Sequence, residues 1–204
     1  MISFKSWSSP ALVLASFVSL ILLISSLAAS ALDFTDPGTS NGSALTFQGE
    51  KYSLKNNASA PGEATDELRE YLREGDDFDG YAKMLALHGY SSELKGDAAQ
   101  LAQATLDQTK KTFPDSYLKE LLLEPDHSVI LMVIVNGNDV EFSLFDYRKT
   151  AGNFTSAQFV LRNKPPYDTQ AKFKTEQDAH FDEWRKELEQ ISLQTPKLLK
   201  ATKK

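Results

Sequence analysis

The sequence predicts an α+β fold in which helices cover an antiparallel sheet. Three observations lead to this prediction. Residues 129–135 are seven consecutive apolar residues, residues 140–147 alternate between apolar and polar side chains, and residues 176–193 carry apolar side chains at helical spacing. The apolar run indicates a strand covered on both faces, and the alternation indicates a strand beside it. The helical stripe needs an apolar surface to pack on, which the sheet supplies.

The N-terminal segment predicts export. Residues 11–27 carry no charge and are mostly apolar, and Lys5 precedes them. A positive start, an apolar centre and a cleavage site of small residues make up a secretory signal peptide. Ala29 and Ala31 form the expected cleavage site, so that Leu32 becomes the first residue of the mature chain.

A retained membrane anchor is the alternative for residues 1–31. Extended to residue 32, the apolar run reaches the roughly 20 residues that a membrane-spanning helix needs. With Lys5 on the cytoplasmic side, the rest of the chain is exported under either interpretation. The expected localisation is therefore periplasmic or secreted, or membrane-anchored if the segment is not removed.

Composition limits the partners and divides the chain. It has 28 acidic and 22 basic residues, a net charge of −6, and no cysteine. We therefore expect no nucleic-acid partner, membrane contact only through residues 1–31, and neither a disulfide nor a thiolate metal site. Residues 32–43 are turn formers and predict a flexible lead-in, residues 44–195 a single domain, and residues 196–204 a basic tail.

The first elements of the domain are short. Strand formers at residues 45–48 and 52–55 flank a Gly-Glu turn and predict a hairpin. In residues 65–74, apolar side chains at i, i+3 and i+4 from Leu68 predict a short helix that Gly75 would end.

The middle of the chain predicts a strand followed by a helix. Residues 81–90 fit a strand or a helix, and we favour the strand because their side chains alternate. Asp97 can cap a helix over residues 97–113, which Pro114 would end. The apolar stripe of this helix is modest, so we expect it on the outside of the sheet.

Residues 129–163 predict a C-terminal three-stranded antiparallel meander. An Asn-Gly pair joins the strands at 129–135 and 140–147, which is a strong hairpin signal. A second turn near 152–153 leads to a strand at about 157–162.

The last predicted element is a helix over about residues 176–193. Thr175 and Asp178 fit a capping box at its start, Trp184 lies in its apolar stripe, and Pro196 would end it.

No catalytic, cofactor or metal site is predicted. The acidic turn at residues 77–80 lacks the first and last carboxylates of a calcium loop. His180 and Glu183 have a spacing that can share a metal ion, but two ligands are too few. The sequence contains no nucleophile elbow and no glycine-rich phosphate loop.

Phe145 and Tyr147 form the one candidate surface for a partner. They share a strand face with Glu141 and Ser143. The two rings would make an exposed aromatic patch, provided that no helix covers that face.

Several short segments follow one another in a distinctive order: Glu70-Tyr71-Leu72, Gly75-Asp76, Phe78-Asp79-Gly80-Tyr81 and Lys83-Met84. Together with residues 140–148 and a strand near 158–159, they resemble a small family of uncharacterised exported proteobacterial proteins over roughly residues 67–165. This resemblance implies that residues 70–72 are extended, against the local helical pattern, and it implies no activity. The order of segments is also similar to the Mog1/PsbP type of α/β/α sandwich.

An export signal without a catalytic signature leads to our first hypothesis, an exported non-enzymatic binding or accessory domain. Its partner would be a protein or small ligand of the cell envelope. One alternative is an accessory subunit tethered to the membrane through residues 1–31. Another is a hydrolase with a carboxylate-based site, which would need two acidic side chains that converge in a cleft.

Overall fold

The computed structural model describes residues 42–59, 67–90, 94–150 and 153–200. All of them belong to the second of two units, Pro37–Lys204. The predictions for residues 1–31, including the cleavage site at Ala29, Ala31 and Leu32, lie outside the described residues. Within the described residues, no helix is both long enough and apolar enough to cross a membrane.

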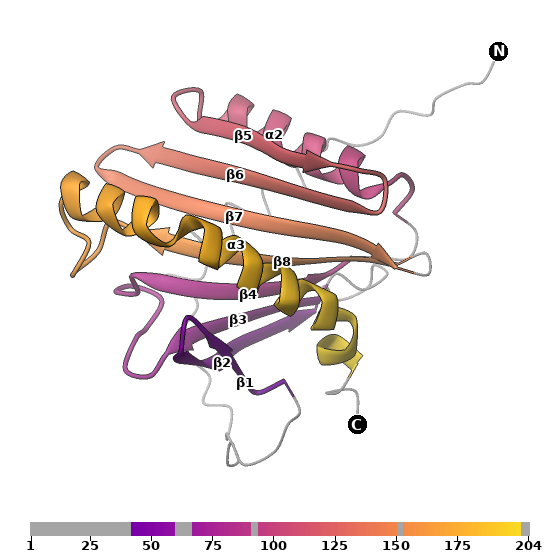
Figure 1. Cartoon of the computed structure of the whole chain (residues 1–204), viewed down its shortest axis with the longest axis horizontal. Coiled ribbons are helices and arrows are strands. Elements are labelled where there is room, and N and C mark those ends of the chain that lie inside the picture. Colours follow the sequence, from indigo (N-terminus) through magenta and orange to yellow (C-terminus); the bar gives the residue numbers. More distant parts are fainter. Residues whose placement is uncertain (1–41, 60–66, 91–93, 151–152, 201–204) are drawn as a thin grey trace. The chain divides into compact units, whose positions relative to one another are not determined.

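The described residues form a mixed α+β fold with an eight-stranded antiparallel sheet and two helices. In the sheet the strands lie in the order β1-β2-β3-β4-β8-β7-β6-β5 (Figure 1). The strands are β1 (Ala44–Phe47), β2 (Glu50–Ser59), β3 (Glu67–Arg73), β4 (Lys83–Gly89), β5 (Tyr117–Leu123), β6 (His127–Asn136), β7 (Asp139–Thr150) and β8 (Asn153–Arg162), and the helices are α2 (Ala98–Thr112) and α3 (Gln170–Lys200).

The two helices lie on opposite faces of the sheet. Helix α3 packs on β1, β4, β7 and β8, and we call this side, which carries Leu85 and Phe159, the first face. Helix α2 packs on β5, β6 and β7. Its contact with Met132 and Tyr147 places it on the second face, which also carries Glu70 and Gln158. Figure 1 shows α3 in front of the sheet and α2 behind its β5 edge.

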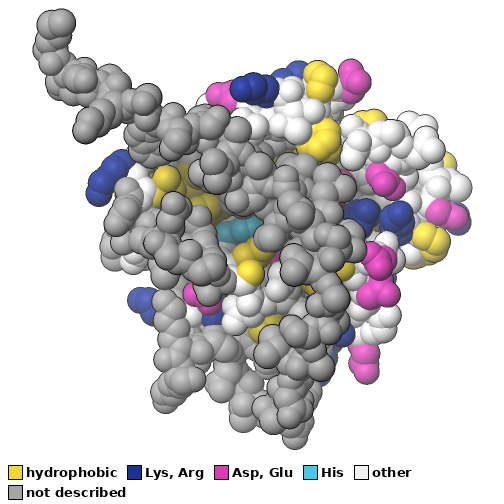
Figure 2. Space-filling model, turned by 180° about the vertical axis from the view of Figure 1, so that it is seen from behind, with side chains coloured by type: hydrophobic (Ala, Val, Ile, Leu, Met, Phe, Trp, Pro, Cys, Tyr) yellow, Lys and Arg dark blue, Asp and Glu magenta, His cyan; other side chains and the backbone are white. Residues whose placement is uncertain are grey.

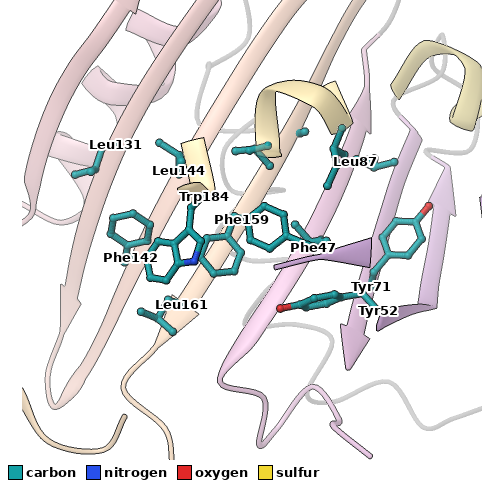
Figure 3. Packing of buried hydrophobic residues seen from close by; sticks show 14 of the residues in the cluster. Phe47, Tyr52, Tyr71, Leu87, Leu131, Phe142, Leu144, Phe159, Leu161 and Trp184 are labelled. Atoms are coloured by element: carbon teal, nitrogen blue, oxygen red, sulfur yellow. The ribbon is translucent and has the colours of Figure 1, made fainter. Parts of the chain in front are cut away.

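Trp184 of α3 is the centre of the core on the first face. Its side chain is fully buried, and its ring centroid lies 4.8 Å from that of Phe159 and 5.6 Å from that of Phe142. Phe47 of the β1–β2 hairpin reaches the same cluster, 4.8 Å from Phe159 (Figure 3). Burying one large aromatic side chain contributes roughly 3 kcal/mol, so this cluster is a major source of stability.

Helix α2 confirms the prediction for residues 97–113. The Asp97 side chain accepts the Gln100 N–H at 2.8 Å, and the Gln100 side chain accepts the Asp97 N–H at 3.2 Å, which completes a capping box. Ala98 and Ala102 face the sheet and are fully buried. Small side chains let the helix lie close to the strands, which explains how a weak apolar stripe suffices.

The helix predicted over residues 65–74 is wrong, because this segment is strand β3. It pairs with β2 on one side and with β4 on the other. Tyr71 and Arg69 point to the first face, and both are fully buried. Two neighbouring strands satisfy the backbone of β3, and this tertiary pairing overrides the local helical spacing. The extended conformation is the one that the family resemblance implied.

Helix α3 is longer than predicted at both ends. It begins at Gln170, so Thr175 and Asp178 lie inside it and do not cap it. It continues through Pro196, which was expected to end it, to Lys200. Residues 196–200 are therefore helical and not part of a basic tail.

A buried arginine explains why α3 continues beyond Pro196. The Arg69 guanidinium donates to the carbonyl oxygens of Leu198 at 2.7 Å and Leu199 at 2.8 Å. Glu67 accepts from the same guanidinium at 2.6 Å, and the Leu199 side chain is buried. Two charge-assisted hydrogen bonds satisfy carbonyl groups that a helix end leaves unpaired, which offsets the bond lost at proline.

The other strands include both predicted and missed elements. The hairpin at 45–55 is β1 and β2, and the strand favoured at 81–90 is β4. The strands expected within 129–163 are β6, β7 and β8, which are three adjacent strands of the eight-stranded sheet. Strand β5 was not predicted, because its sequence YLKELLL lacks clean alternation and it lies at an edge with most side chains partly or fully exposed.

Candidate binding groove

A groove of 470 Å³ lies on the first face between α3 and the strands β5, β6 and β7. Its floor is apolar and comes from the strands, and its α3 side is mainly polar. The lining residues are Tyr117, Lys119, Leu121, Leu131, Val133, Phe142, Gln177, Asp178, Ala179, Phe181, Asp182 and Glu183.

The groove exists because α3 fills the first face only in part. Phe181 is half-buried and packs edge-on against Phe142, with the ring centroids 6.5 Å apart. The helix packs mainly on β8, β7 and β4, whereas β5 and β6 carry the outer wall of the groove. Tyr117 on that wall is 57% exposed.

Strand β5 forms one edge of the described sheet, with β6 as its neighbour. A β-bulge at Leu121 interrupts the register between Glu120 and Leu122. An edge strand presents backbone N–H and C=O groups that can pair with another chain, and charged residues and bulges limit uncontrolled pairing. Lys119, Glu120 and the bulge are such features.

The α3 wall of the groove is acidic. Asp178, Asp182 and Glu183 line it, and Lys119 is the one basic residue of the lining. Asp178 pairs with Lys174 at 2.6 Å, and Glu183 lies 3.3 Å from His180 Nδ1. The groove therefore carries more negative than positive charge.

One buried polar atom in the groove has no partner. Among the described residues, Gln177 Nε2 is buried and makes no hydrogen bond. An unpaired buried donor costs about 1–3 kcal/mol. Gln177 is one of the residues that line the groove.

The structure does not place Phe145 and Tyr147 on the surface. Phe145 is 4% and Tyr147 is 1% exposed, and their rings stack with centroids 5.5 Å apart. The Tyr147 hydroxyl donates to Thr105 of α2 at 3.0 Å. The predicted exposed patch is therefore wrong, because α2 covers this part of the second face.

The second face carries a buried row of polar side chains. The side-chain oxygen of Gln158 lies 3.4 Å from His88 Nε2, and the side-chain nitrogen of Gln158 donates to the Ser143 hydroxyl at 3.1 Å. The Ser143 hydroxyl in turn donates to the Glu141 carboxylate at 3.1 Å. Burial lowers the pKa of His88 to about 4, against the opposing effect of its contact with Gln158. Figure 2 shows the molecule from this side.

Two carboxyl groups of the strands on this face have shifted pKa values, those of Glu70 and Glu141. Burial raises the pKa of both, and Asn56 opposes the shift at Glu70 through a 2.7 Å hydrogen bond. The strand register places the two residues three strands and four residues apart, or about 20 Å between their backbones. An inverting pair of catalytic carboxyl groups is about 6.5–9.5 Å apart. The register therefore does not favour the carboxylate-based hydrolase.

The Asp146 carboxylate contacts three polar side chains beneath the C-terminal half of α3. It accepts from Ser192 at 2.6 Å and from Arg148 at 3.0 Å, and His127 Nε2 lies 3.0 Å from it. A nucleophilic serine needs a histidine as its base, whereas Ser192 is fully buried and donates to the carboxylate. This cluster attaches α3 to the sheet.

The other residues considered in the sequence have structural roles. The Asp77 carboxylate accepts the backbone N–H groups of Asp79 at 3.1 Å and Gly80 at 2.8 Å, as in an Asx turn. His180 and Glu183 pair on the exposed side of α3. In the described part of the chain, no group of three or more acidic or histidine side chains could hold a metal ion.

The groove was missed in the sequence because its residues come from three strands and a helix. A signal was present in the exposed apolar residues of 117–123, directly before the strongest strand of the chain. Without the pairing of β5 with β6, this signal could not be connected to the acidic side of α3.

Comparison with known proteins identifies the family but no activity. No curated protein matches the chain. A model of an uncharacterised protein family matches residues 40–193, which include all eight strands, α2, most of α3 and the whole groove. The chain therefore belongs to this uncharacterised family.

Proposed function

We propose that the protein is an exported, non-enzymatic binding domain that holds a partner in the groove beside β5. The observation that carries this proposal is the groove itself, which combines an apolar floor from β6 and β7 with a mainly acidic wall from α3. Such a combination of apolar surface and a few polar groups is typical of binding sites.

The polar groups elsewhere are used internally. Asp146 is occupied by Ser192, His127 and Arg148, and the Glu141 carboxylate by Ser143. These hydrogen bonds attach α3 and the strands to one another, which is a structural role. This supports a binding role over an enzymatic one.

Export is supported by the pattern of residues 1–31. The test is the mass and the N-terminus of the protein recovered after fractionation of its host. A soluble species that starts at Leu32 is the expected result. An intact chain in the membrane fraction would instead support the tethered accessory subunit, with the same domain outside the cytoplasm.

The groove is tested by filling it. Ala179 lines the groove on α3, so an Ala179→Phe substitution would occupy it. Ala171 is an exposed alanine on the same helix outside the groove and gives a matched control, Ala171→Phe. Amide resonances of the labelled protein would be followed by NMR while short peptides are added. In these peptides valine alternates with lysine, with serine or with glutamate.

At least one of these peptides should shift resonances of the groove residues in the wild-type protein and in Ala171→Phe. The shifts should be lost in Ala179→Phe. If no peptide shifts the groove resonances, or if Ala179→Phe leaves the shifts unchanged, the groove is not the binding site and the proposal fails.

We also propose that the fold is related to the Mog1/PsbP type of α/β/α sandwich. The support is the layer order, with α3 on one face of the antiparallel sheet and α2 on the other. Superposition of an experimental structure on that fold would test it, and a different strand order would contradict it.

A further inference from the structure

We infer that residues 165–183 form a strap that opens and closes the α3 side of the groove, and that Lys83 holds this strap closed. The inference rests on the proposed function, because it assigns a control to the same groove. Four observations support it, namely the sparse packing of the strap, its two fixed ends, a buried ion pair at Lys83 and a second partner for that lysine.

The strap is held by few apolar contacts. Seven residues of α3 are buried, and Phe173 is the one among them that lies before Trp184. Phe181, on the groove side, is half-buried. Segments with few buried apolar contacts open locally at a low cost in free energy. We therefore expect the strap to open more readily than the rest of α3.

The two ends of the strap are fixed to the sheet. The Asn163 side chain accepts the backbone N–H of Val140 at 2.9 Å and donates to the carbonyl oxygen of Asn138 at 2.8 Å. At the other end, the Trp184 side chain is fully buried in the core of the first face. Opening is thereby confined to the residues between Asn163 and Trp184.

Three side chains form a latch between β4 and the strap, and they are Lys83, Glu176 and Tyr167. The Lys83 side chain is 8% exposed, and its Nζ lies 2.9 Å from the Glu176 carboxylate. The Tyr167 hydroxyl donates to the same carboxylate at 3.1 Å, and Lys83 Nζ lies 5.4 Å from the centroid of the Tyr167 ring. Burial acts to lower the pKa of Lys83, but its hydrogen bonds with Glu176 and Tyr167 outweigh this effect and raise the pKa above its usual value. Lys83 is therefore a cation that holds two residues of the strap at once.

The latch and the groove lie on opposite sides of the strap. In the order β4-β8-β7-β6-β5, strand β8 separates β4, which carries Lys83, from the three strands that line the groove. Figure 1 shows α3 crossing in front of these strands. Asp178, Phe181 and Asp182 of the strap line the groove. When the latch is released, the strap can move away from the sheet, and the groove then loses its α3 wall.

A second carboxylate makes the open state accessible. Glu50 of the β1–β2 hairpin is 37% exposed and lies 3.7 Å from Lys83 Nζ. A buried cation that loses its partner is strongly destabilised. When Glu176 moves away into water, Glu50 remains on the hairpin and keeps Lys83 paired. The lysine thus has a partner in both positions of the strap, as a switch between two discrete arrangements requires.

Hydrogen exchange and ring contacts measured by NMR test the inference without a ligand. Lys83→Met removes the cation and keeps a long side chain, and Glu176→Gln removes the charge from its partner on the strap. In both variants, amides of residues 174–183 should exchange about tenfold faster than in the wild type, and amides of residues 184–200 should change less than about twofold. The nuclear Overhauser effect between the Phe181 and Phe142 rings, whose centroids are 6.5 Å apart, should weaken in both variants.

The matched control is Lys172→Met. Lys172 is an exposed lysine of the strap, and its partner Asp168, 3.2 Å away, belongs to the strap as well. This substitution removes a charge and an ion pair but no ion pair with the sheet. Exchange in residues 174–183 should therefore stay within about twofold of the wild type.

The outcomes separate the inference from the proposed function. If neither Lys83→Met nor Glu176→Gln speeds exchange in the strap, or if the contact between Phe181 and Phe142 persists in both, the inference is overturned and the groove can still bind a partner as a preformed site. If Lys172→Met speeds exchange as much as Lys83→Met, or if residues 184–200 also exchange faster, Lys83 is not a latch and the inference is overturned. If the variants open the strap and the peptide titration fails, the strap is supported and the proposed function falls.

Discussion

Two regions of the first face differ in how α3 covers them. In the closed region, residues 184–200 of α3 lie on the sheet and bury their apolar side chains against β4 and β8. The buried residues of this half include Trp184, Leu188, Ile191 and Leu199. In the open region, residues 177–183 line a groove beside β5, and Phe181 is only half-buried.

The difference shows how one helix can serve two purposes. Its second half stabilises the sheet through a filled core and is attached by Asp146 and Arg69. This attachment fixes the position of the first half, which does not need to fill the space over β5. The four predictions below test this division, from the largest expected effect to the smallest.

Replacement of Trp184 should give the largest loss of stability. Trp184→Ala removes a fully buried ring from contact with Phe142 and Phe159 and should lower the free energy of unfolding by about 3–5 kcal/mol. Phe181→Ala, in the open region, should cost about 1 kcal/mol. Denaturant unfolding measures both, and equal costs would mean that the two regions do not differ.

Arg69 should be nearly as important, because it holds the end of α3. Arg69→Met removes the bonds to Leu198 and Leu199 and leaves Glu67 without its cation, which should cost about 3 kcal/mol. The control is Arg73→Met, whose ion pairs with Asp76 and Glu50 are more exposed and should be worth under about 1 kcal/mol. Unchanged hydrogen exchange at the end of α3 in Arg69→Met would contradict this role.

His88, in the buried polar row of the second face, should make the fold sensitive to acid. Its pKa is about 4 in the folded protein, below the unfolded value of about 6.5, so the unfolded chain binds the proton first as pH falls. The stabilising effect is complete above pH 6.5 and is lost as pH falls towards 4, by about 3 kcal/mol.

The pH dependence of unfolding should therefore be weaker in a His88→Gln variant over this interval. Titration of the His88 ring protons by NMR gives the folded pKa directly. A midpoint near 6.5 would show that this part of the second face is not closed to water.

Gln177 should have the smallest effect on stability. Gln177→Met removes the unpaired buried amide, so the free energy of unfolding should stay within about 0.5 kcal/mol of the wild type or rise. The control is Gln194→Met at an exposed position of the same helix, which should leave the free energy of unfolding unchanged. A clear loss of stability in Gln177→Met would assign this side chain a structural role.

Local signals predicted the elements whose conformation is encoded by neighbouring residues, and they failed where distant contacts decide the conformation. The apolar run of β6, the Asn-Gly turn and the cap at Asp97 are encoded by neighbouring residues, and these elements were predicted. Strand β3 was assigned wrongly because its conformation depends on two partner strands. The extension of α3 past Pro196 depends on Arg69, which is more than a hundred residues away in the sequence.

The groove could not be predicted for the same reason. Tyr117 and Asp182 are 65 positions apart in the chain and lie on opposite walls of one surface. Single-sequence patterns report which face of an element is apolar, but they do not report where a helix stops covering a sheet. Phe145 and Tyr147 were misplaced because the position of α2 was not known.

The most direct test of the account is amide hydrogen exchange along α3. Residues 184–195, which lie in the closed region, should exchange about tenfold more slowly than residues 177–183, which line the groove. Equal exchange in the two parts of the helix would contradict the division of the first face into a closed and an open region.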